Sequence, residues 1–214
     1  MIRLLLADDH KLVRDGLKQI LAAVADVEVA AEAASGDQVL SLVKTGAFDL
    51  VLLDMSMPGL SGINLIKRLK LERPKLRILV LSMHGEHQYA ARALKAGASG
   101  YLTKDSASEQ LVGAIRKIAA GGVYITEAAA ASLVGDAGGT DAPAHTQLSD
   151  REFEIFRLLA EGHGPTEIAA QLRLSVKTVS THKTHILEKM NLGSTAELVR
   201  YALEHRLLDQ TPGA

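Results

Sequence analysis

Five polar side chains suited to phosphoryl chemistry follow short apolar runs in the first half of the chain. They are the carboxylates of Asp8, Asp9 and Asp54, the hydroxyl of Ser82 and the ammonium group of Lys104. If the apolar runs are parallel strands, their carboxyl ends meet at one edge of a sheet, where such sheets collect their polar chemistry. The sequence therefore predicts one cluster of three carboxylates, a hydroxyl and a lysine.

A cluster of crowded carboxylates indicates a bound cation, because like charges repel. A small number of hard oxygen ligands suits Mg²⁺, which keeps several waters and bridges carboxylates to phosphate oxygens. Asp54 is then the natural nucleophile, since carboxylates accept phosphoryl groups as acyl phosphates. Mg²⁺ and Lys104 would stabilise the charge on the transferring group, and Ser82 could hydrogen-bond a phosphoryl oxygen afterwards.

Each of these residues also has an ordinary structural interpretation. A lone Asp after a strand is most often a turn residue or a helix cap, and Asp8-Asp9 before a helix could simply complement the helix dipole. A lysine beyond a strand is usually solvated, and a serine there usually bonds the backbone. Five such residues at the ends of four strands are much harder to explain in this way together.

The surrounding residues alternate between strand and helix patterns. Strands are expected at Ile2–Ala7, Val27–Ala31, Leu50–Leu53, Ile78–Leu81 and Gly100–Leu102. Helices are expected at Leu12–Val24, Gln38–Lys44, Ile63–Leu71, His87–Ala96 and Glu109–Ala120. Nearly continuous apolar strands that alternate with helices favour an α/β fold, with a five-stranded parallel sheet covered by helices on both faces.

The composition changes once along the chain. Val134–Thr146 contains three Gly, one Pro and almost no large apolar side chain, so we expect it to be a flexible linker. The chain is therefore divided into a first domain at 1–120, a short helix and flexible linker at 121–147, and a second domain at 148–214.

The second domain has no strand pattern and is expected to be a small all-α domain. Its four helices are predicted at Phe153–Ala160, Thr166–Leu172, Val176–Met190 and Ala196–Leu207. Gly164, Pro165 and Glu167 give a start signal for the second helix, and Ser175 can cap the third. Helix, tight turn and helix over 166–190 suit a helix-turn-helix whose second helix enters the major groove of DNA.

The third of these helices carries a polar face that could contact DNA. Its residues are Lys177, Thr178, Ser180, Thr181, Lys183 and Thr184. Positions 177, 180, 181 and 184 follow the spacing of one helix side. The alternative is a four-helix packing module with a solvated face. Over 148–209 there are 8 Lys or Arg and 9 Asp or Glu, so the net charge does not favour a nucleic-acid partner.

The whole-chain composition narrows the class of protein. The chain has 214 residues, 47% of them apolar, no cysteine and a net charge of −1. A disulfide scaffold and a thiolate metal site are therefore excluded, and a reducing cytoplasm is the expected location. The apolar run at the N-terminus is too short for a signal peptide. No apolar stretch approaches the roughly 20 residues of a membrane helix, so no membrane association is expected.

Four stretches of the first domain carry a family resemblance. They are LLLADDH at Leu4–His10, DLVLLDMSMPGLSG at Asp49–Gly62, LVLS at Leu79–Ser82 and GASGYLTKD at Gly97–Asp105. On these stretches residues 1–120 resemble a response-regulator receiver domain, which implies a flavodoxin-like fold. Asp105 departs from many receivers, in which a proline often follows the lysine.

The resemblance implies roles in metal binding and phosphorylation. Asp8 and Asp9 would bind Mg²⁺, together with Asp54 and the backbone carbonyl of Ser56. Asp54 would be phosphorylated by a histidine kinase, and Lys104 would pair with the phosphoryl group.

The resemblance also implies a conformational switch. Ser82 would move toward the phosphoryl group, and Tyr101 would rotate inward as Ser82 moves. Phosphorylation at Asp54 would thereby shift a two-state equilibrium of the receiver.

Four stretches of the second domain carry a second resemblance. They are LSDREFEIFRLLAEG at Leu148–Gly162, EIA at Glu167–Ala169, LSVKTVSTH at Leu174–His182 and ILEKM at Ile186–Met190. These stretches resemble the LuxR-type helix-turn-helix, and the whole chain resembles the NarL/FixJ family of response regulators. At His163–Thr166 the sequence departs from many members, which have leucine, serine, asparagine and lysine there.

This second resemblance assigns the DNA contacts. It implies that phosphates are contacted by Lys177, Thr178 and Lys183, and that base edges are faced by Ser180, Thr181 and Thr184. The last helix, around Ala196–Leu203, would form the dimer contact on DNA. The base preference itself cannot be deduced, because Ser and Thr accept several bases.

The expected function is therefore a two-component transcription regulator and not an enzyme. Its implied partners are a histidine kinase, double-stranded DNA, RNA polymerase and, when phosphorylated or on DNA, a second copy of the chain. One alternative is a phosphohydrolase that uses Asp54 as a turnover nucleophile, although Ser56 stands where its acid–base carboxylate would be. Another is a phosphorylation-independent DNA-binding or adaptor protein with a vestigial receiver.

Two other patterns carry no functional prediction. The pairs His84/His87 and His182/His185 have spacing that a metal could use, but neither pair has an evident third ligand. The first strand is not followed by the glycine pattern of a dinucleotide site, and no phosphate-binding P-loop is present.

Overall fold

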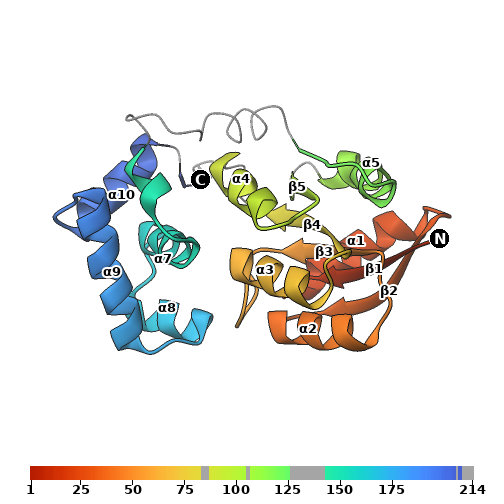
Figure 1. The fold of residues 1–214 in the computed structure, drawn as a ribbon, viewed down its shortest axis with the longest axis horizontal. Helices are drawn as coiled ribbons and strands as arrows, with labels where there is room; N and C mark the ends of the chain where they lie inside the picture. The colour runs from red at the N-terminus through yellow and green to blue at the C-terminus, as the bar shows by residue number, and fades with distance from the viewer. Residues whose placement is uncertain (83–86, 105–106, 126–142, 206, 209–214) are drawn as a thin grey trace. The chain divides into compact units, whose positions relative to one another are not determined.

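The computed structural model describes residues 1–82, 87–104, 107–125, 143–205 and 207–208 (Figure 1). The chain divides after Ser132 into two compact units. Residues 126–142 lie outside the described residues and include most of the region predicted as short helix and linker. His84 and Asp105 also lie outside them, and only the backbone of His87 is described.

The N-terminal unit is built on a parallel sheet of five strands in the order β2-β1-β3-β4-β5. The strands are β1 at Ile2–Ala7, β2 at Val27–Ala33, β3 at Leu50–Asp54, β4 at Arg77–Ser82 and β5 at Gly100–Thr103. All four neighbouring pairs are parallel, which confirms the predicted flavodoxin-like sheet. The strand order reverses between β1 and β3, so a crevice for ligands is expected beyond their carboxyl ends.

Helices cover both faces of this sheet (Figure 1). They are α1 at Lys11–Ala22, α2 at Gly36–Thr45, α3 at Gly62–Glu72, α4 at His87–Lys95 and α5 at Ala107–Ala119. On one face, Leu4 of β1 is buried in the same cluster as Leu17 of α1 and Ile115 of α5. Its neighbour Leu5 points to the opposite face and is also fully buried. Burial on both faces explains why the strands read as continuous apolar runs.

In the described part of the C-terminal unit, every regular element is a helix. Its elements are the 3₁₀ helix η1 at Ala144–Gln147, α7 at Asp150–Ala160, α8 at Pro165–Leu172, α9 at Val176–Met190 and α10 at Thr195–Glu204. All four predicted α-helices are present, and each begins within three residues of its predicted start. Gly164 is the N-cap of α8, and the Ser175 hydroxyl accepts a hydrogen bond from the Thr178 N–H at the start of α9.

The turn between α8 and α9 is short and is closed by backbone hydrogen bonds. Arg173 ends α8 in the left-handed region, with φ of 53°, and the Leu174 N–H donates to the Ala169 carbonyl at 2.8 Å. The N–H groups of Arg173 and Leu174 thus bond carbonyls in the last turn of α8. Helix α9 begins immediately after Ser175. The two helices of the helix-turn-helix are therefore held by a three-residue turn.

The structure differs from the sequence prediction at both ends of this unit. The predicted linker includes Ala144–Thr146, but these residues belong to η1, where His145 is buried and its Nδ1 lies 2.8 Å from the Tyr201 hydroxyl. At the other end, α10 stops at Glu204, whereas the prediction extends to Leu207. The Leu207 N–H bonds the Ala202 carbonyl, so the chain turns back while the Leu207 side chain remains buried.

Candidate functional site

The carboxyl edge of the sheet brings together the acidic residues and the lysine. Asp8 follows β1, Asp54 ends the neighbouring strand β3, and Lys104 follows β5. Lys104 Nζ lies 2.7 Å from Asp8 Oδ2 and 3.2 Å from Asp54 Oδ2. One ammonium group therefore bridges two carboxylates that come from adjacent strands.

These charges are buried, and burial determines how they titrate. Asp8 and Asp54 are 1% and 2% exposed. Burial raises the pKa of the Asp54 carboxyl, the Lys104 charge lowers it, and the nearby Asp8 charge adds to the increase. Burial alone would lower the pKa of Lys104, but the charges of Asp54 and Asp8 raise it above its ordinary value. The lysine therefore stays protonated between two carboxylates.

Ser56 and Ser82 contact Asp54 and Lys104 respectively, and Tyr101 lies on the strand that precedes Lys104. A backbone hydrogen bond from Ser56 lowers the pKa of Asp54. Ser82 ends β4, the strand beside β3, and its side chain is buried. Its carbonyl accepts a hydrogen bond from the Lys104 N–H at 2.8 Å. Tyr101 is buried on β5, one strand further along the sheet.

His10 is a member of the cluster that sequence reasoning missed. Its ring nitrogen Nδ1 lies 2.9 Å from Asp9 Oδ1 and 3.4 Å from Asp8 Oδ1. Its backbone N–H donates a hydrogen bond to Asp8 Oδ1 at 2.8 Å. The only sequence signal was its position directly after the two acids. Arg14 also supports the site, because its Nη1 donates to the Asp8 carbonyl at 2.7 Å.

The cluster fits a divalent cation on its own geometry. Asp8, Asp9, His10 and Asp54 each offer a ligand atom, and these atoms lie within 4.8 Å of one another. Asp9 Oδ1 and Asp54 Oδ2 are buried, and each has one close nitrogen, of His10 and Lys104 respectively, but no hydrogen-bond partner. Buried polar atoms are rarely left unsatisfied, so carboxylate oxygens in excess over one lysine suit a hard cation such as Mg²⁺.

The exposed face of α9 carries the hydroxyls predicted to face DNA. Ser180, Thr181 and Thr184 are exposed. Their hydroxyls donate to the carbonyls four residues earlier, at 2.9, 3.0 and 3.2 Å respectively. Each hydroxyl proton is thus used within the helix, which leaves oxygen lone pairs as acceptors toward the solvent.

The predicted phosphate contacts on α9 differ in exposure. Lys177 is exposed, whereas Thr178 and Lys183 are half-buried. The Thr178 hydroxyl lies 2.7 Å from the Ser175 hydroxyl at the N-cap. The exposed side of the helix also continues beyond the predicted set to His185 and Glu188.

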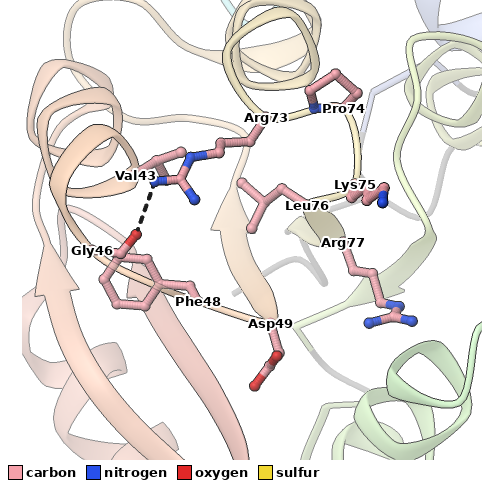
Figure 2. A pocket seen from close by; sticks show the side chains of 9 residues that line it. All are labelled: Val43, Gly46, Phe48, Asp49, Arg73, Pro74, Lys75, Leu76 and Arg77. Carbon is pink, nitrogen blue, oxygen red and sulfur yellow. Dashed lines mark hydrogen bonds between the residues drawn. The ribbon is translucent and has the colours of Figure 1, made fainter.

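A cavity of about 520 Å³ lies at the opposite edge of the sheet (Figure 2). It is lined by Val43, Gly46, Phe48, Asp49, Arg73, Pro74, Lys75, Leu76 and Arg77. The Arg73 guanidinium donates to the Gly46 carbonyl at 3.3 Å, as the dashed line shows. None of the predicted site residues lines this cavity.

None of the described helices combines the length and the apolar composition that crossing a bilayer requires.

Two protein families match the chain in succession. The family described as "Response regulator receiver domain" matches residues 4–116, and "Bacterial regulatory proteins, luxR family" matches residues 146–202.

Similar proteins span nearly the whole chain. "Oxygen regulatory protein NreC" of Staphylococcus carnosus (strain TM300) is 41% identical over 217 residues, which cover 97% of this chain and 100% of the relative. "Response regulator UvrY" of Escherichia coli (strain K12) is 35% identical over 210 residues, with 97% and 96% covered.

Solved structures are similar over the same length. A structure of the RcsB response regulator of Salmonella typhimurium is 28% identical with a TM-score of 0.76, and covers 95% of this chain and 97% of that one. An RcsB–DNA complex is 28% identical with a TM-score of 0.60, and covers 94% and 98%. The similarity therefore includes both units of the chain in the same order.

Proposed function

The chain belongs to the NarL/FixJ family of response regulators, and from this premise we propose that phosphorylation of Asp54 controls its dimerisation and DNA binding. As a member of that family it joins a receiver domain to a LuxR-type DNA-binding domain and regulates transcription. We propose domain limits of 1–120 for the receiver and 148–214 for the DNA-binding domain, and we add η1 to the latter because His145 packs on α10.

The proposed reaction is transfer of a phosphoryl group from a phosphohistidine of a histidine kinase. One oxygen of the Asp54 carboxylate attacks phosphorus, so the P–O bond forms while the P–N bond breaks. The electron pair of the P–N bond returns to the imidazole, and an acyl phosphate remains on Asp54. Lys104, 3.2 Å from Asp54, favours the ionised carboxylate that attacks and would then pair with the phosphoryl oxygens.

The metal proposed for this reaction is Mg²⁺. Asp8, Asp9, Asp54 and the backbone carbonyl of Ser56 would hold it. The buried oxygens of Asp9 and Asp54, which have no hydrogen-bond partner, support this assignment. When bound, Mg²⁺ neutralises negative charge on the phosphoryl oxygens.

Ser82 and Tyr101 are the proposed switch pair. Ser82 would donate its hydroxyl proton to a phosphoryl oxygen, and Tyr101 would rearrange as Ser82 moves. Support comes from their places in the sheet: Ser82 ends β4, which lies beside the strand that carries Asp54, and Tyr101 is on β5, which lies beside β4. A movement at Asp54 would therefore reach the edge of the sheet through two neighbouring strands.

The proposed DNA-reading element is α9. Lys177, Thr178 and Lys183 would contact phosphates, and base edges would be faced by the exposed hydroxyls of Ser180, Thr181 and Thr184. The proposed dimer contact is the α10 segment Ala196–Leu203, where Leu203 is 59% exposed. One solved structure of the similar protein RcsB is described as two RcsB dimers bound to two parallel DNAs.

The remaining partners follow from this function. We propose a cognate histidine kinase upstream, RNA polymerase as a partner at promoters, and the cytoplasm as the location, because DNA is the proposed ligand. A phosphohydrolase is less well supported, because Ser56 stands where a second carboxylate would be needed for turnover.

The observation that carries the proposal is the convergence of Asp8, Asp54 and Lys104. Its test is incubation with acetyl phosphate and MgCl₂, followed by the intact mass and by titration with duplexes selected from a random library. We expect one added phosphoryl group and tighter DNA binding in the wild type, and neither in Asp54→Asn. A phosphoryl group retained by Asp54→Asn, or DNA affinity indifferent to phosphorylation, would overturn it.

A further inference from the structure

A single carboxylate oxygen joins the start of α7 to the end of α9. Glu152 Oε2 accepts hydrogen bonds from the Ser149 N–H at 2.8 Å and from the Ser149 hydroxyl at 2.8 Å. The same oxygen lies 2.6 Å from Lys189 Nζ, in the last turn of α9. The capping box of α7 is therefore also the anchor of a lysine from the recognition helix.

The environment of Glu152 makes this anchor strong. Burial alone would raise the pKa of Glu152, but the bonds from Lys189 and Ser149 overcome burial and lower the pKa to about 2. The carboxylate therefore stays ionised at every physiological pH. Hydrogen bonds between ionised partners are roughly twice as strong as neutral ones.

Lys189 lies on a different side of α9 from most of the proposed reading face. At 100° per residue, it is about 180° from Ser180, about 140° from Thr184 and about 80° from Thr181 around the helix axis. His182, seven residues before Lys189, is on the same side as the lysine. Burial lowers the pKa of His182 and the Glu152 charge opposes that effect, which places Glu152 near this side of α9.

An anchor on this side of α9 would fix the rotation of the helix about its own axis together with the buried side chains of Val179, Ile186 and Met190. Side chains reach about 6 Å from a helix axis, so a rotation of about 10° moves their tips by about 1 Å. Hydrogen bonds to base edges tolerate little displacement of that size, whereas contacts to phosphates depend mainly on charge.

We propose that Glu152 is a positioning residue for sequence recognition, which acts through Lys189 by fixing the rotation of α9. This inference rests on the proposed function of α9. It predicts a particular defect when the anchor is broken: discrimination between DNA sequences is lost, while binding to unrelated DNA is kept.

The test compares variants of the full-length, acetyl-phosphate-treated protein on three duplexes. These are a duplex selected by the wild type from a random library, its single-base variants, and a scrambled duplex. We expect Glu152→Gln to reduce the affinity ratio between selected and scrambled duplexes by about tenfold, with scrambled binding changed by no more than about twofold. Thermal unfolding of each variant fixes a temperature at which all of them are folded.

Glu167→Gln is the matched control. Glu167 has the same place in α8 as Glu152 has in α7, and its carboxylate accepts the N–H of the N-cap Gly164 at 2.7 Å. The change in charge is the same, but no contact to α9 is lost. This variant should keep the discrimination of the wild type, and equal losses in both variants would overturn the inference.

Variants of Lys189 break the contact with Glu152 while they leave the capping box of α7 intact. Lys189→Gln should lose discrimination as Glu152→Gln does, Lys189→Arg should retain it, and the double variant should be no worse than either single one. Additive losses in the double variant would contradict action through Lys189.

A measurement without DNA separates this inference from the proposed function. Residual dipolar couplings of the α9 amides in the free protein report the orientation of α9 relative to α7. If the wild type shows no preference among DNA sequences, the proposed function fails. The couplings then test by themselves whether Glu152 orients α9. Couplings changed in Glu152→Gln but not in Glu167→Gln support the anchor, and unchanged couplings overturn it.

Discussion

At the residue scale, the charges around Asp54 affect stability as well as reactivity. Asp54 and Asp8 are buried beside each other, with one lysine between them. The pKa of Asp54 is raised in the folded state, so the folded protein holds this proton more tightly than the unfolded chain does. Stability from this group is present at low pH and is lost as the pH rises through the raised pKa.

Neutralising Asp54 should therefore stabilise the metal-free protein at neutral pH. We expect Asp54→Asn to increase the free energy of unfolding of the receiver by roughly 1–2 kcal/mol, because it removes an ion that Lys104 only partly compensates. MgCl₂ should stabilise the wild type by binding the folded state, and should do so much less in the variant. Chemical denaturation with and without MgCl₂ measures both effects.

Asp49→Asn is the control for that experiment. Asp49 is exposed and directly precedes β3, at the opposite edge of the sheet. Its carboxylate accepts a hydrogen bond from the backbone N–H of Arg3 at 2.8 Å. It should lose a little stability and keep the full response to MgCl₂. A stability of Asp54→Asn equal to or below that of the wild type, without metal, would contradict the proposed electrostatics.

Glu152 should produce the opposite pH dependence in the C-terminal unit. Its pKa falls from 4.5 to about 2 on folding, and because the partner Lys189 is exposed to solvent, we expect a contribution of roughly 1 kcal/mol to stability. Because the folded pKa is depressed, this stability is present above pH 4.5 and is lost as the pH falls toward 2. Amide resonances of α7 and α9 in the intact chain report the unfolding of this unit. Its stability should fall steeply with decreasing pH in the wild type and much less steeply in Glu152→Gln. Parallel acid curves for the two proteins would show that Glu152 is not the group that titrates.

At the element scale, most of the fold follows from apolar periodicity. The five strands are predicted because burial on both faces of a parallel sheet makes them continuously apolar. Asp54 and Lys104 are then located by the ends of their strands, and only strand order was needed to bring them together. The cluster could therefore be predicted down to its members, except for His10, whose exposed ring gives no sequence pattern.

The elements that sequence patterns missed depend on contacts between residues far apart in the chain. The 3₁₀ helix η1 lies in a stretch of small residues, and the ring of its His145 contacts those of Phe153, Tyr201 and His205. His145 and Tyr201 are 56 residues apart, and a contact at that separation produces no periodic pattern in the sequence. The same holds for Glu152 and Lys189, which look like an ordinary cap and an ordinary surface lysine until the helices are packed.

Removing the Tyr201 hydroxyl should loosen the attachment of η1 to α10. Tyr201→Phe takes away the oxygen that lies 2.8 Å from His145 Nδ1, and we expect a loss of about 1 kcal/mol in the unfolding free energy of the C-terminal unit. Tyr124→Phe is the control, because its hydroxyl donates to Gln110 in the other unit. An equal loss in both variants would mean that the His145 contact contributes nothing of its own.

At the scale of the whole molecule, the proposed dimer depends on α10. Leu203 is 59% exposed there, and an exposed leucine on a helix expected to pair is best placed to be covered by a second copy. Leu203→Asp should leave the phosphorylated protein monomeric in sedimentation and weaken binding to a two-half-site duplex by about tenfold or more.

Leu71→Asp serves as the control for the dimer prediction. Leu71 is 76% exposed on α3 of the receiver, so the same change in charge and size is made away from α10. It should dimerise on DNA as the wild type does. A Leu203→Asp protein that still forms dimers would remove α10 from the proposed interface.

The burial of Asp8 and Asp54 has a consequence for how the protein responds to ionic strength. Mobile ions screen exposed charges over about 8–10 Å but screen buried pairs much less, so the phosphoryl acceptor should react at nearly the same rate in dilute and concentrated salt. The exposed face of α9 should not be protected in this way, because contacts to DNA phosphates weaken steeply as salt is added. A salt titration should therefore separate the two activities of one chain: receipt of the signal would continue at ionic strengths at which its transmission to DNA has already failed.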